Sequence, residues 1–407
     1  MNILFINEYF TQCVKTGANT ISFSTYFLMK EKGNTCYFYS NDEGTLFEKQ
    51  NINKFFPKSH IYTNSFLYRL NSIYNFEAAQ NLEKVIKETK PDIVHIHAIM
   101  ELSYSFVNVL KKHNIPYIIT VHDPMYVCPV MGTRKQYCTL CSDNIFNCVK
   151  NRCSRDNYFN SLYMAIRFFI NKKLIKNYEP KIIITPSKAL QSYIKQTKFS
   201  KTAEFSVIPN ALDKTFLNVI PNYKNKGYFL FVGNLLDVKG VNILLEAINN
   251  LPKDIDFHII GDGLQKEKYL QFVKENNLNN VKFLGKKNRD ELILEYQNCI
   301  AVIVPSNWFE IFGMINIEAF INGKPVIASN IGGIPEQVEN EKTGLLFEPA
   351  NVAQLQDCIL KYWKNPDLVV EHGKNAYEKA KKQYSEERYY NELIQIYNKV
   401  LNLEEAI

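Results

Sequence analysis

The chain has 407 residues, enough for two or three domains, and its 46% hydrophobic and 22% charged composition excludes a disordered or fibrous protein. No uncharged apolar run approaches the ~20 residues that cross a bilayer, and the N-terminus lacks the basic segment and cleavage site of a signal peptide. Nine cysteines, an odd number, favour a reducing compartment over a disulfide framework, so we expect a soluble cytoplasmic protein.

In the first half of the chain, short apolar runs alternate with helical patterns. Strands are predicted over 1–7, 36–40, 91–97 and 116–121, and helices over 19–32, 77–89 and 103–113. Strands separated by helix-length segments form parallel βαβ units, which predicts a doubly wound, Rossmann-like α/β domain over 1–206. A Cys-rich insertion follows the last of these strands, at about 124–157. His95 and His97 lie on one face of a buried strand, so we interpret them as core histidines.

The same pattern restarts after a boundary near 207–213. Strands begin at 228, 257, 281 and 300, and each ends in a glycine turn or a proline. This predicts a second doubly wound domain over 207–385. A helical segment follows over 386–407, and packing back on the first domain is one arrangement open to it. Two such domains that face each other would enclose a central cleft outside the carboxyl ends of their sheets, where ligands of open α/β sheets bind.

The positive charge is concentrated in the first half. Residues 1–206 contain 26 Lys and Arg against 15 Asp and Glu, whereas residues 207–407 contain 22 against 26. A basic half favours an anionic partner, such as a membrane surface, a phosphorylated substrate or nucleic acid. No nucleic-acid-binding module is recognisable, so we expect no nucleic-acid partner.

The strongest chemical motif lies where a predicted strand ends at Pro305 and a helix is predicted to start near Met314. A loop with one glycine joins them; Glu310 lies in the loop and Glu318 in the first turns of the helix. Free N–H groups at a helix start suit a diphosphate, and carboxylates accept hydrogen bonds from sugar hydroxyls. Either glutamate alone would be interpreted as a solvated surface charge, but the pair at this junction favours a binding site.

These residues carry a family resemblance. Glu310-x7-Glu318, with Gly-Lys-Pro-Val-Ile-Ala-Ser at 323–329, resembles the donor-binding motif of the retaining GT-B glycosyltransferases of family 4. Segments elsewhere agree with the family and follow its order: 16–17, 120–123, 207–213, 231–240, 260–263 and 332–336 with Gly344. The resemblance covers nearly the whole chain. It implies a GT-B fold and transfer of a sugar from a UDP- or GDP-linked donor to a glycan or polyprenyl-diphosphate-linked acceptor in cell-surface polysaccharide synthesis.

The resemblance also implies roles for individual residues. Glu318 would hold the ribose hydroxyls, and Glu310 would hold hydroxyls of the donor sugar. Lys239 would stabilise the departing diphosphate, and His122 would contact the donor sugar near the reacting carbon. Gly17 would let the backbone approach the phosphates. Backbone N–H groups of four residues would meet sugar and phosphate: Phe312, Gly313, Met314 and Ile315.

The chain departs from the family at Asn234. Family members usually carry Arg or another basic residue directly after the glycine that corresponds to Gly233. An amide stabilises a departing diphosphate less than a second cation does. Either Lys286, Lys287 or Arg289 substitutes for the missing cation, or the leaving group is stabilised more weakly.

The resemblance implies a retaining transfer, in which the acceptor attacks from the face of the leaving group and a phosphate oxygen takes its proton. Catalysis would then depend mainly on positioning and electrostatics, and no catalytic cofactor is expected. Two rivals remain: a GT-B nucleotide-sugar epimerase, and a non-catalytic partner subunit that binds nucleotide-sugar, which Asn234 motivates. Sugar transfer rather than isomerisation of the donor would exclude the epimerase, and turnover by the native chain would exclude the non-catalytic subunit.

Two features of the first half have structural or membrane interpretations. Cys138-x2-Cys141 has structural-zinc spacing, and Cys148 and Cys153 can complete a tetrahedral site; the alternative is reduced thiols that pack an irregular loop. Residues 158–181 form a helical pattern that mixes apolar and basic residues. Such a helix either lies on the anionic inner face of a membrane, as in a peripheral protein, or packs on its domain with solvated lysines.

Overall fold

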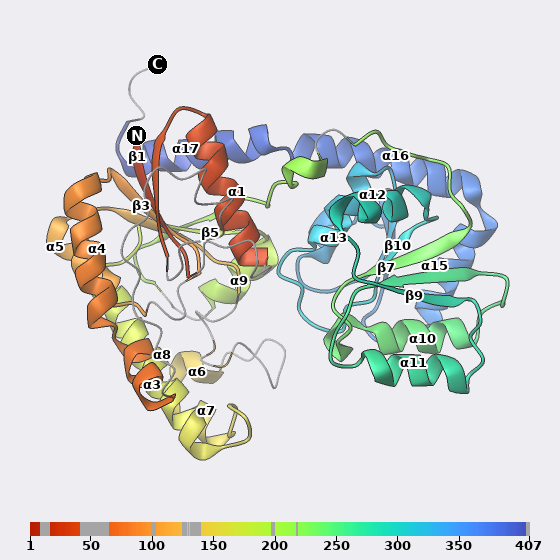
Figure 1. The fold of residues 1–407 in the computed structure, drawn as a ribbon, viewed down its shortest axis with the longest axis horizontal. Helices are drawn as coiled ribbons and strands as arrows, with labels where there is room; N and C mark the ends of the chain where they lie inside the picture. Colours follow the sequence, from red (N-terminus) through yellow and green to blue (C-terminus); the bar gives the residue numbers. More distant parts are fainter. Residues whose placement is uncertain are drawn as a thin grey trace. The chain divides into compact units, whose positions relative to one another are not determined.

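The computed structural model describes residues 1–8, 17–40, 65–98, 103–123, 128, 130, 140–196, 200–216 and 219–403. The chain forms two compact units (Figure 1). Met1–Ile208 and Tyr390–Ile407 make up the first unit, and Pro209–Tyr389 the second. Residues 386–389, which the sequence places with the C-terminal segment, are therefore part of the second unit.

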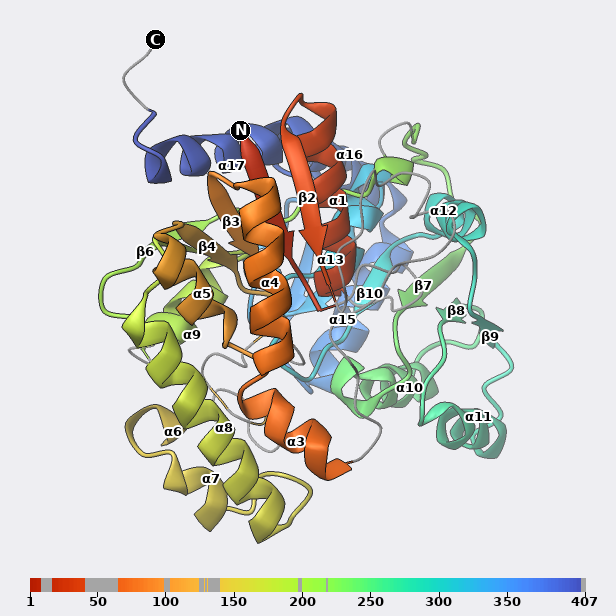
Figure 2. The ribbon, with the colours of Figure 1, turned by 60° about the vertical axis from the view of Figure 1, so that its left-hand side comes forward.

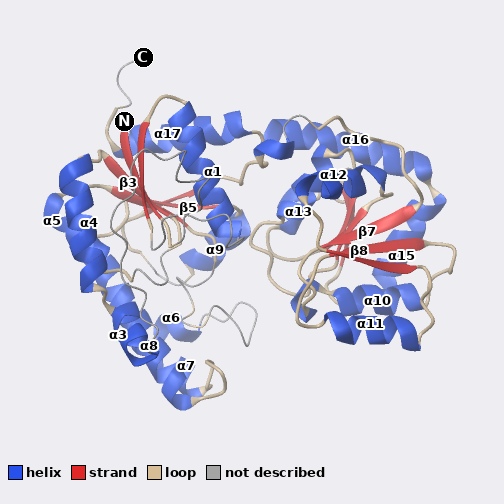
Figure 3. Cartoon of the chain, in the orientation of Figure 1, coloured by secondary structure: helices blue, strands red, loops and turns tan. Residues whose placement is uncertain are grey.

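Within its described residues, the first unit contains a six-stranded parallel sheet in the order β2-β1-β3-β4-β5-β6. The strands are β1 (Asn2–Ile6), β2 (Thr35–Tyr39), β3 (Ile93–Ile96), β4 (Tyr117–Thr120), β5 (Ile182–Thr185) and β6 (Glu204–Val207). The helices are α1 (Gly17–Glu31), α3 (Ser65–Ile73), α4 (Phe76–Thr89), α5 (Phe106–His113), α6 (Leu140–Asp143), α7 (Phe146–Lys150), α8 (Tyr158–Asn177) and α9 (Lys188–Lys195). Helices cover both faces of the sheet (Figure 3).

The predicted strands and helices of the first half are all present, but some ends differ. The helix predicted from Ser103 starts at Phe106, because Ser103 adopts a positive φ of 57° and its Oγ accepts a hydrogen bond from Asn75 N. Asn75 in turn caps α4 by accepting from Ala78 N at 2.9 Å. The sequence interpretation did not assign β5, β6 or α3.

The described part of the second unit also holds a six-stranded parallel sheet, in the order β12-β11-β10-β7-β8-β9. The strands are β7 (Tyr228–Val232), β8 (Asp256–Ile260), β9 (Val281–Gly285), β10 (Val302–Val304), β11 (Val326–Ser329) and β12 (Gly344–Phe347). The helices are α10 (Val241–Asn249), α11 (Lys266–Glu275), α12 (Arg289–Asn298), α13 (Met314–Ile321), α14 (Ile334–Gln337), α15 (Val352–Lys364) and α16 (Pro366–Gln383).

Alternating residues of the second sheet point into two cores. Phe229 and Phe231 of β7 enter one core with α10 and α15, whereas Tyr228 and Leu230 enter the other with α13 and α16. A sheet buried on both faces explains why its strands appear in the sequence as continuous apolar runs.

The last helix, α17 (Glu386–Val400), begins in the second unit and continues in the first. Tyr397 is fully buried, and its hydroxyl lies 2.7 Å from His95 Nδ1 on β3. Lys399 pairs with Glu204 of β6 at 2.5 Å. The last turns of α17 thus contribute to the first unit's core. None of the helices in the described residues is long and apolar enough to cross a bilayer.

Candidate functional site

Lys239 and Glu310 meet at the carboxyl end of the second sheet. Lys239 ends a short 3-10 helix, Asp237–Lys239, and the next residue, Gly240, has a φ of 74°. A Cβ on Gly240 would lie 1.8 Å from the carbonyl oxygen of Pro305, so only glycine lets this turn touch the loop after β10. Lys239 Nζ then pairs with Glu310 Oε1 at 2.5 Å, and Ser306 Oγ donates to the same oxygen at 2.7 Å.

The backbone of Glu310 is held by a second glycine turn. Gly333 N donates to Glu310 O at 2.7 Å. A Cβ on Gly332, whose φ is 60°, would approach that oxygen to 2.2 Å. The segment 332–336, which carries part of the family resemblance, therefore has a local physical role: it fixes the loop that presents Glu310.

Glu318 lies on α13 and is 7% exposed. Its carboxylate accepts hydrogen bonds from Tyr296 Oη at 2.8 Å and from Arg289 Nη1 at 3.3 Å. Burial raises the pKa of Glu318, and the Arg289 charge and the Tyr296 hydrogen bond oppose that rise. Arg289 also lies 3.6 Å from Asp213. A buried carboxylate oriented in this way suits a pair of vicinal hydroxyls.

The start of α13 lies beside these glutamates. Its N-cap is Gly313, which has no side chain to satisfy the first N–H groups, so these groups remain for an anion. A Cβ at this position would lie 2.4 Å from Asn316 Nδ2 and 2.8 Å from Gln337 Oε1, so a larger residue there would displace these side-chain amides. The strand–loop–helix arrangement predicted around Met314 is therefore present, and Phe312 and Ile315 flank the helix start.

Gly233 and Asn234 follow β7. Gly261 has a φ of 142°, and a Cβ on it would lie 1.8 Å from Gly233 O, so the ends of β7 and β8 approach through glycine backbone. The Asn234 side chain is exposed. Asn234, the residue at which the chain departs from the family pattern, therefore has a side chain that is open to solvent.

The three cations considered as substitutes for a basic residue at 234 all pair with carboxylates. Lys286 lies 3.9 Å from Asp262, and Lys287 lies 3.7 Å from Glu295. Arg289 holds Glu318. Arg289 therefore orients the carboxylate of Glu318, the residue expected to bind the ribose. The sequence interpretation did not predict this role.

In the first unit, three histidines lie together at the ends of β3 and β4; His95 and His97 are buried, and His122 is partly buried. His97 Nδ1 lies 2.9 Å from His122 Nε2, and His95 Nε2 lies 2.7 Å from Thr120 Oγ1. Burial lowers the pKa of His122 to about 4 and of His95 to about 3, and it holds the pKa of His97 well below its usual range. All three imidazoles are therefore neutral at pH 7.

Sequence reasoning interpreted His97 as a satisfied core residue, but it contacts His122 and its Nε2 is buried without a partner. The signal was available, because His97 and His122 follow neighbouring predicted strands at their carboxyl ends. Gly17 begins α1, and a Cβ there would meet no atom of the described residues within 4 Å, so the described structure gives no steric reason for a glycine at this position. Thr16 lies outside the described residues.

Cys138 also lies outside the described residues. Cys128, Cys141 and Cys148 are buried in one apolar cluster, and Cys153 packs against it. A hydrogen bond between the thiols lowers the pKa of Cys141 and raises that of Cys148. Among the described residues, no three His, Cys, Asp or Glu side chains are arranged to hold a metal ion. The zinc site stays a prediction, which zinc determination on the native protein tests.

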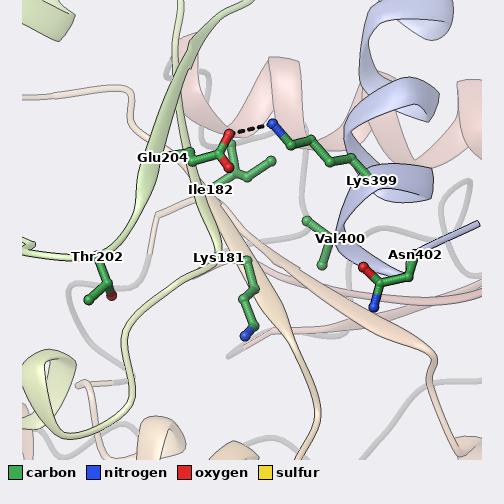
Figure 4. A pocket seen from close by; sticks show the side chains of 7 residues that line it. All are labelled: Lys181, Ile182, Thr202, Glu204, Lys399, Val400 and Asn402. Carbon is green, nitrogen blue, oxygen red and sulfur yellow. Dashed lines mark hydrogen bonds and ion pairs between the residues drawn. The ribbon is translucent and has the colours of Figure 1, made fainter. Parts of the chain in front are cut away.

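A pocket of about 710 Å³ lies elsewhere in the first unit, at the beginnings of β5 and β6 and beside the end of α17 (Figure 4). Lys181, Glu204 and Lys399 supply its charged groups, and the last two form an ion pair with each other. The pocket lies at the amino ends of the strands, whereas His122 lies at their carboxyl ends. This pocket is therefore separate from the candidate site.

Comparison with known families agrees with this geometry. Residues 28–216 match Glycosyltransferase Family 4, and residues 213–383 match Glycosyl transferases group 1. The chain belongs to the family 4 glycosyltransferases. The two matched regions overlap at 213–216 and together include Glu310, Glu318, Lys239 and His122.

Glycosyltransferases of known sequence are similar to this chain over part of their length. An uncharacterised glycosyltransferase of Methanocaldococcus jannaschii is 38% identical over 43% of this chain and 48% of its own. The D-rhamnosyltransferase WbpZ of Pseudomonas aeruginosa is 34% identical over 37% of this chain and 39% of its own. The chain thus spans about half or less of the length of these two relatives.

Solved structures resemble the whole chain. A glycosyltransferase from Rickettsia africae has a TM-score of 0.73 at 19% identity, with 99% of each chain covered. HepE of Anabaena, solved with UDP, has a TM-score of 0.70 at 20% identity, with 98% of this chain and all of that chain covered. At this identity the likeness establishes the GT-B fold alone.

Proposed function

We propose that this protein transfers a sugar, with retention of configuration, from a UDP- or GDP-linked donor to a glycan or polyprenyl-diphosphate-linked acceptor in cell-surface polysaccharide synthesis. One observation carries the proposal: Glu310, Glu318, Lys239 and the uncapped start of α13 meet at one end of one sheet. This set combines acceptors for hydroxyls with donors for phosphate, as a nucleotide-sugar requires.

In the proposed donor complex, Glu318 accepts hydrogen bonds from the ribose, with Arg289 and Tyr296 holding its carboxylate in place. Lys239 contacts the diphosphate and exchanges part of its contact with Glu310 for one with phosphate. Glu310 then accepts a hydroxyl of the donor sugar. The amides of 312–315 meet the sugar and phosphate. The first unit's His122, as a neutral imidazole, contacts the sugar.

The reaction proposed is attack by an acceptor hydroxyl on the face from which the diphosphate leaves. The bond from the sugar carbon to phosphate oxygen breaks, the bond to the acceptor oxygen forms, and a phosphate oxygen takes the acceptor proton. Stabilisation of the developing negative charge by Lys239 and helix amides is the main catalytic contribution. The residues of this chain supply these interactions, so the proposal includes no catalytic cofactor.

The names of similar proteins support the donor and acceptor classes. HepE was solved with UDP-glucose, and a relative from Staphylococcus aureus is named poly(ribitol-phosphate) α-N-acetylglucosaminyltransferase. We propose the same classes of substrate here, a nucleotide-sugar and a polymer or lipid-linked precursor. With a lipid-linked acceptor, the enzyme would work as a peripheral protein at the cytoplasmic face of a membrane.

A second candidate is a non-catalytic subunit that binds nucleotide-sugar. The exposed amide of Asn234, where the family carries a cation, favours it. Such a subunit would keep the Glu318 site but lack turnover. Asn234→Arg would then restore the cation and raise activity from near zero.

A thermal-shift panel with UDP, GDP, their sugar conjugates and NAD tests the donor site. Ligand at ~100 times its dissociation constant adds about 2.7 kcal/mol to the native state, so we expect a clear shift with UDP or GDP that Glu318→Ala abolishes. A shift with NAD alone, or with none of these, would contradict the proposal. Product analysis with a radiolabelled donor then separates transfer, epimerisation and binding without turnover.

A further inference from the structure

Helix α8 exposes a row of large apolar side chains. Phe159 is 80% exposed and Phe169 is 53% exposed, with Leu162 and Ile166 between them. Spacings of three and four residues put these side chains on one face of the helix. A different face of α8 packs into the first unit through Ala165, Phe168 and Ile175. The exposed row is therefore additional to the core-facing side.

Neighbouring helices add to this surface. Phe146 on α7 is 63% exposed, and α7 packs directly on α8 (Figures 1 and 2). On the other side, α3 is tied to α8 because Arg69 Nη2 donates to Asn160 Oδ1 at 2.8 Å. We define the α7–α8 face as Phe146, Phe159, Leu162, Ile166 and Phe169. Large exposed apolar side chains on two helices that pack together mark a contact with a partner or a membrane.

The segment that carries the α7–α8 face is rich in positive charge, although one of its cations, Arg167, is buried. Residues 140–178 contain seven Lys and Arg but two Asp and no Glu. One of the aspartates, Asp156, lies 3.5 Å from Arg152. Lys173 and Lys176 are exposed, and their spacing continues the apolar row toward the end of α8. Aromatic side chains on one face with cations beside them match an anionic lipid surface, where rings enter the headgroup boundary and cations meet phosphates.

We propose that the α7–α8 face docks the first unit on an anionic bilayer. Phe146, Phe159 and Phe169 insert at the boundary between headgroups and acyl chains, and Lys173 and Lys176 contact lipid phosphates. This proposal rests on the proposed function, because it would bring the enzyme to the bilayer that holds a lipid-linked acceptor. The binding itself requires no turnover and is measured separately.

The test is co-sedimentation of the full chain with vesicles of phosphatidylcholine alone or with 30% phosphatidylglycerol. We expect binding to the anionic vesicles that weakens as salt rises, and a loss of at least tenfold in the triple variant Phe146→Ser, Phe159→Ser, Phe169→Ser. Lys173→Glu with Lys176→Glu should lower binding and its salt dependence. Matched controls are Leu294→Ser, exposed in the second unit, and Lys274→Glu on α11.

A fluorescence measurement identifies the inserted side chain. In the variant Phe159→Trp, the fluorescence of the introduced tryptophan should shift to shorter wavelengths on anionic vesicles. Brominated lipid should quench this fluorescence. Equal vesicle binding by wild type and the triple variant, or no binding by wild type, would overturn the proposal. If the triple variant instead abolishes self-association or a protein contact, the face is a protein interface and the lipid proposal is wrong.

The UDP or GDP thermal shift separates the two proposals. Vesicle binding without a nucleotide shift would contradict the proposed function and leave the lipid surface intact. A thermal shift with nucleotide but no vesicle binding would contradict the lipid proposal and leave the proposed function intact. The triple variant should keep its nucleotide shift, which also shows that it is folded.

Discussion

The carboxylate of Glu318 is held by hydrogen bonds from Arg289 and Tyr296. Glu318→Gln keeps the size of the side chain but removes its charge. We expect ten- to a hundredfold weaker binding of whichever of UDP and GDP the wild type binds, since hydrogen bonds to charged groups contribute about 1.5–3 kcal/mol. Calorimetric titration measures this, with exposed Glu246→Gln as the control. Unchanged affinity would mean that Glu318 does not touch the nucleotide.

Lys239 carries the charge that should matter most in the transition state. Lys239→Ala should lower kcat by about 10²–10³ and change KM little, because the diphosphate gains negative charge as its bond to the sugar breaks. Asn234→Arg should raise kcat. Steady-state kinetics with a labelled donor checks both. The variant Lys274→Ala, at an exposed position, is the matched control. If Lys239→Ala raised KM and left kcat unchanged, Lys239 would contribute to ground-state binding only.

The buried histidines predict a dependence of stability on pH. Between pH 6.5 and about 4, the unfolded chain protonates His95 and His122, whereas the native chain does not. The free energy of unfolding should therefore fall with falling pH, by up to about 1.4 kcal/mol per pH unit for each histidine. Urea unfolding at pH 7 and pH 5 measures this. His95→Gln should reduce the difference between the two pH values; an unchanged difference would contradict it.

At the scale of single elements, α17 is fixed to the first sheet by Tyr397. Tyr397→Phe removes the hydroxyl that bonds His95 Nδ1 and leaves that nitrogen buried without a partner. We expect about 1–3 kcal/mol lower stability of the first unit. Denaturant unfolding followed by circular dichroism measures it. Tyr390→Phe is the control, because its ring keeps its contact with Lys32.

The sequence predicts elements where one local rule decides them. β1, β3 and β4 are apolar runs buried on both faces, and the motif around Glu310 and Glu318 spans nine consecutive residues. In contrast, β6 begins with an exposed Glu204 at the edge of the sheet, so its pattern is weak. Short β5 follows directly after a helix of mixed apolar and basic residues, which hides its beginning.

Packing of the segment 386–407 on the first domain was one of the arrangements left open, but individual contacts between residues distant in the sequence were not predicted. Tyr397 and His95 are separated by 302 positions, and Arg289 and Glu318 by 29. No spacing rule joins such pairs, because their meeting depends on strand order and helix packing. The resemblance to the family identified Glu318 but not the residues that orient it.

At the scale of the whole molecule, each unit has its own sheet and core. Glu310, Glu318 and Lys239 all belong to the second unit. The nucleotide should therefore raise the melting temperature of the second unit more than that of the first, by an amount set by ligand concentration. Differential scanning calorimetry with and without saturating UDP or GDP measures this, and Glu318→Gln should remove the effect. An equal rise for both units would contradict it.

The division of α17 between the units also constrains the order of folding during synthesis. The second unit is one continuous stretch, 209–389, whereas the first needs residues 390–403, which the ribosome makes after the entire second unit. The first sheet therefore emerges early but waits for Tyr397 before His95 gains its partner. A chain that ends at residue 389 and has been released from the ribosome should show a protease-resistant second unit and a protease-sensitive first one. The earliest part of the chain to be made is then the last to be completed.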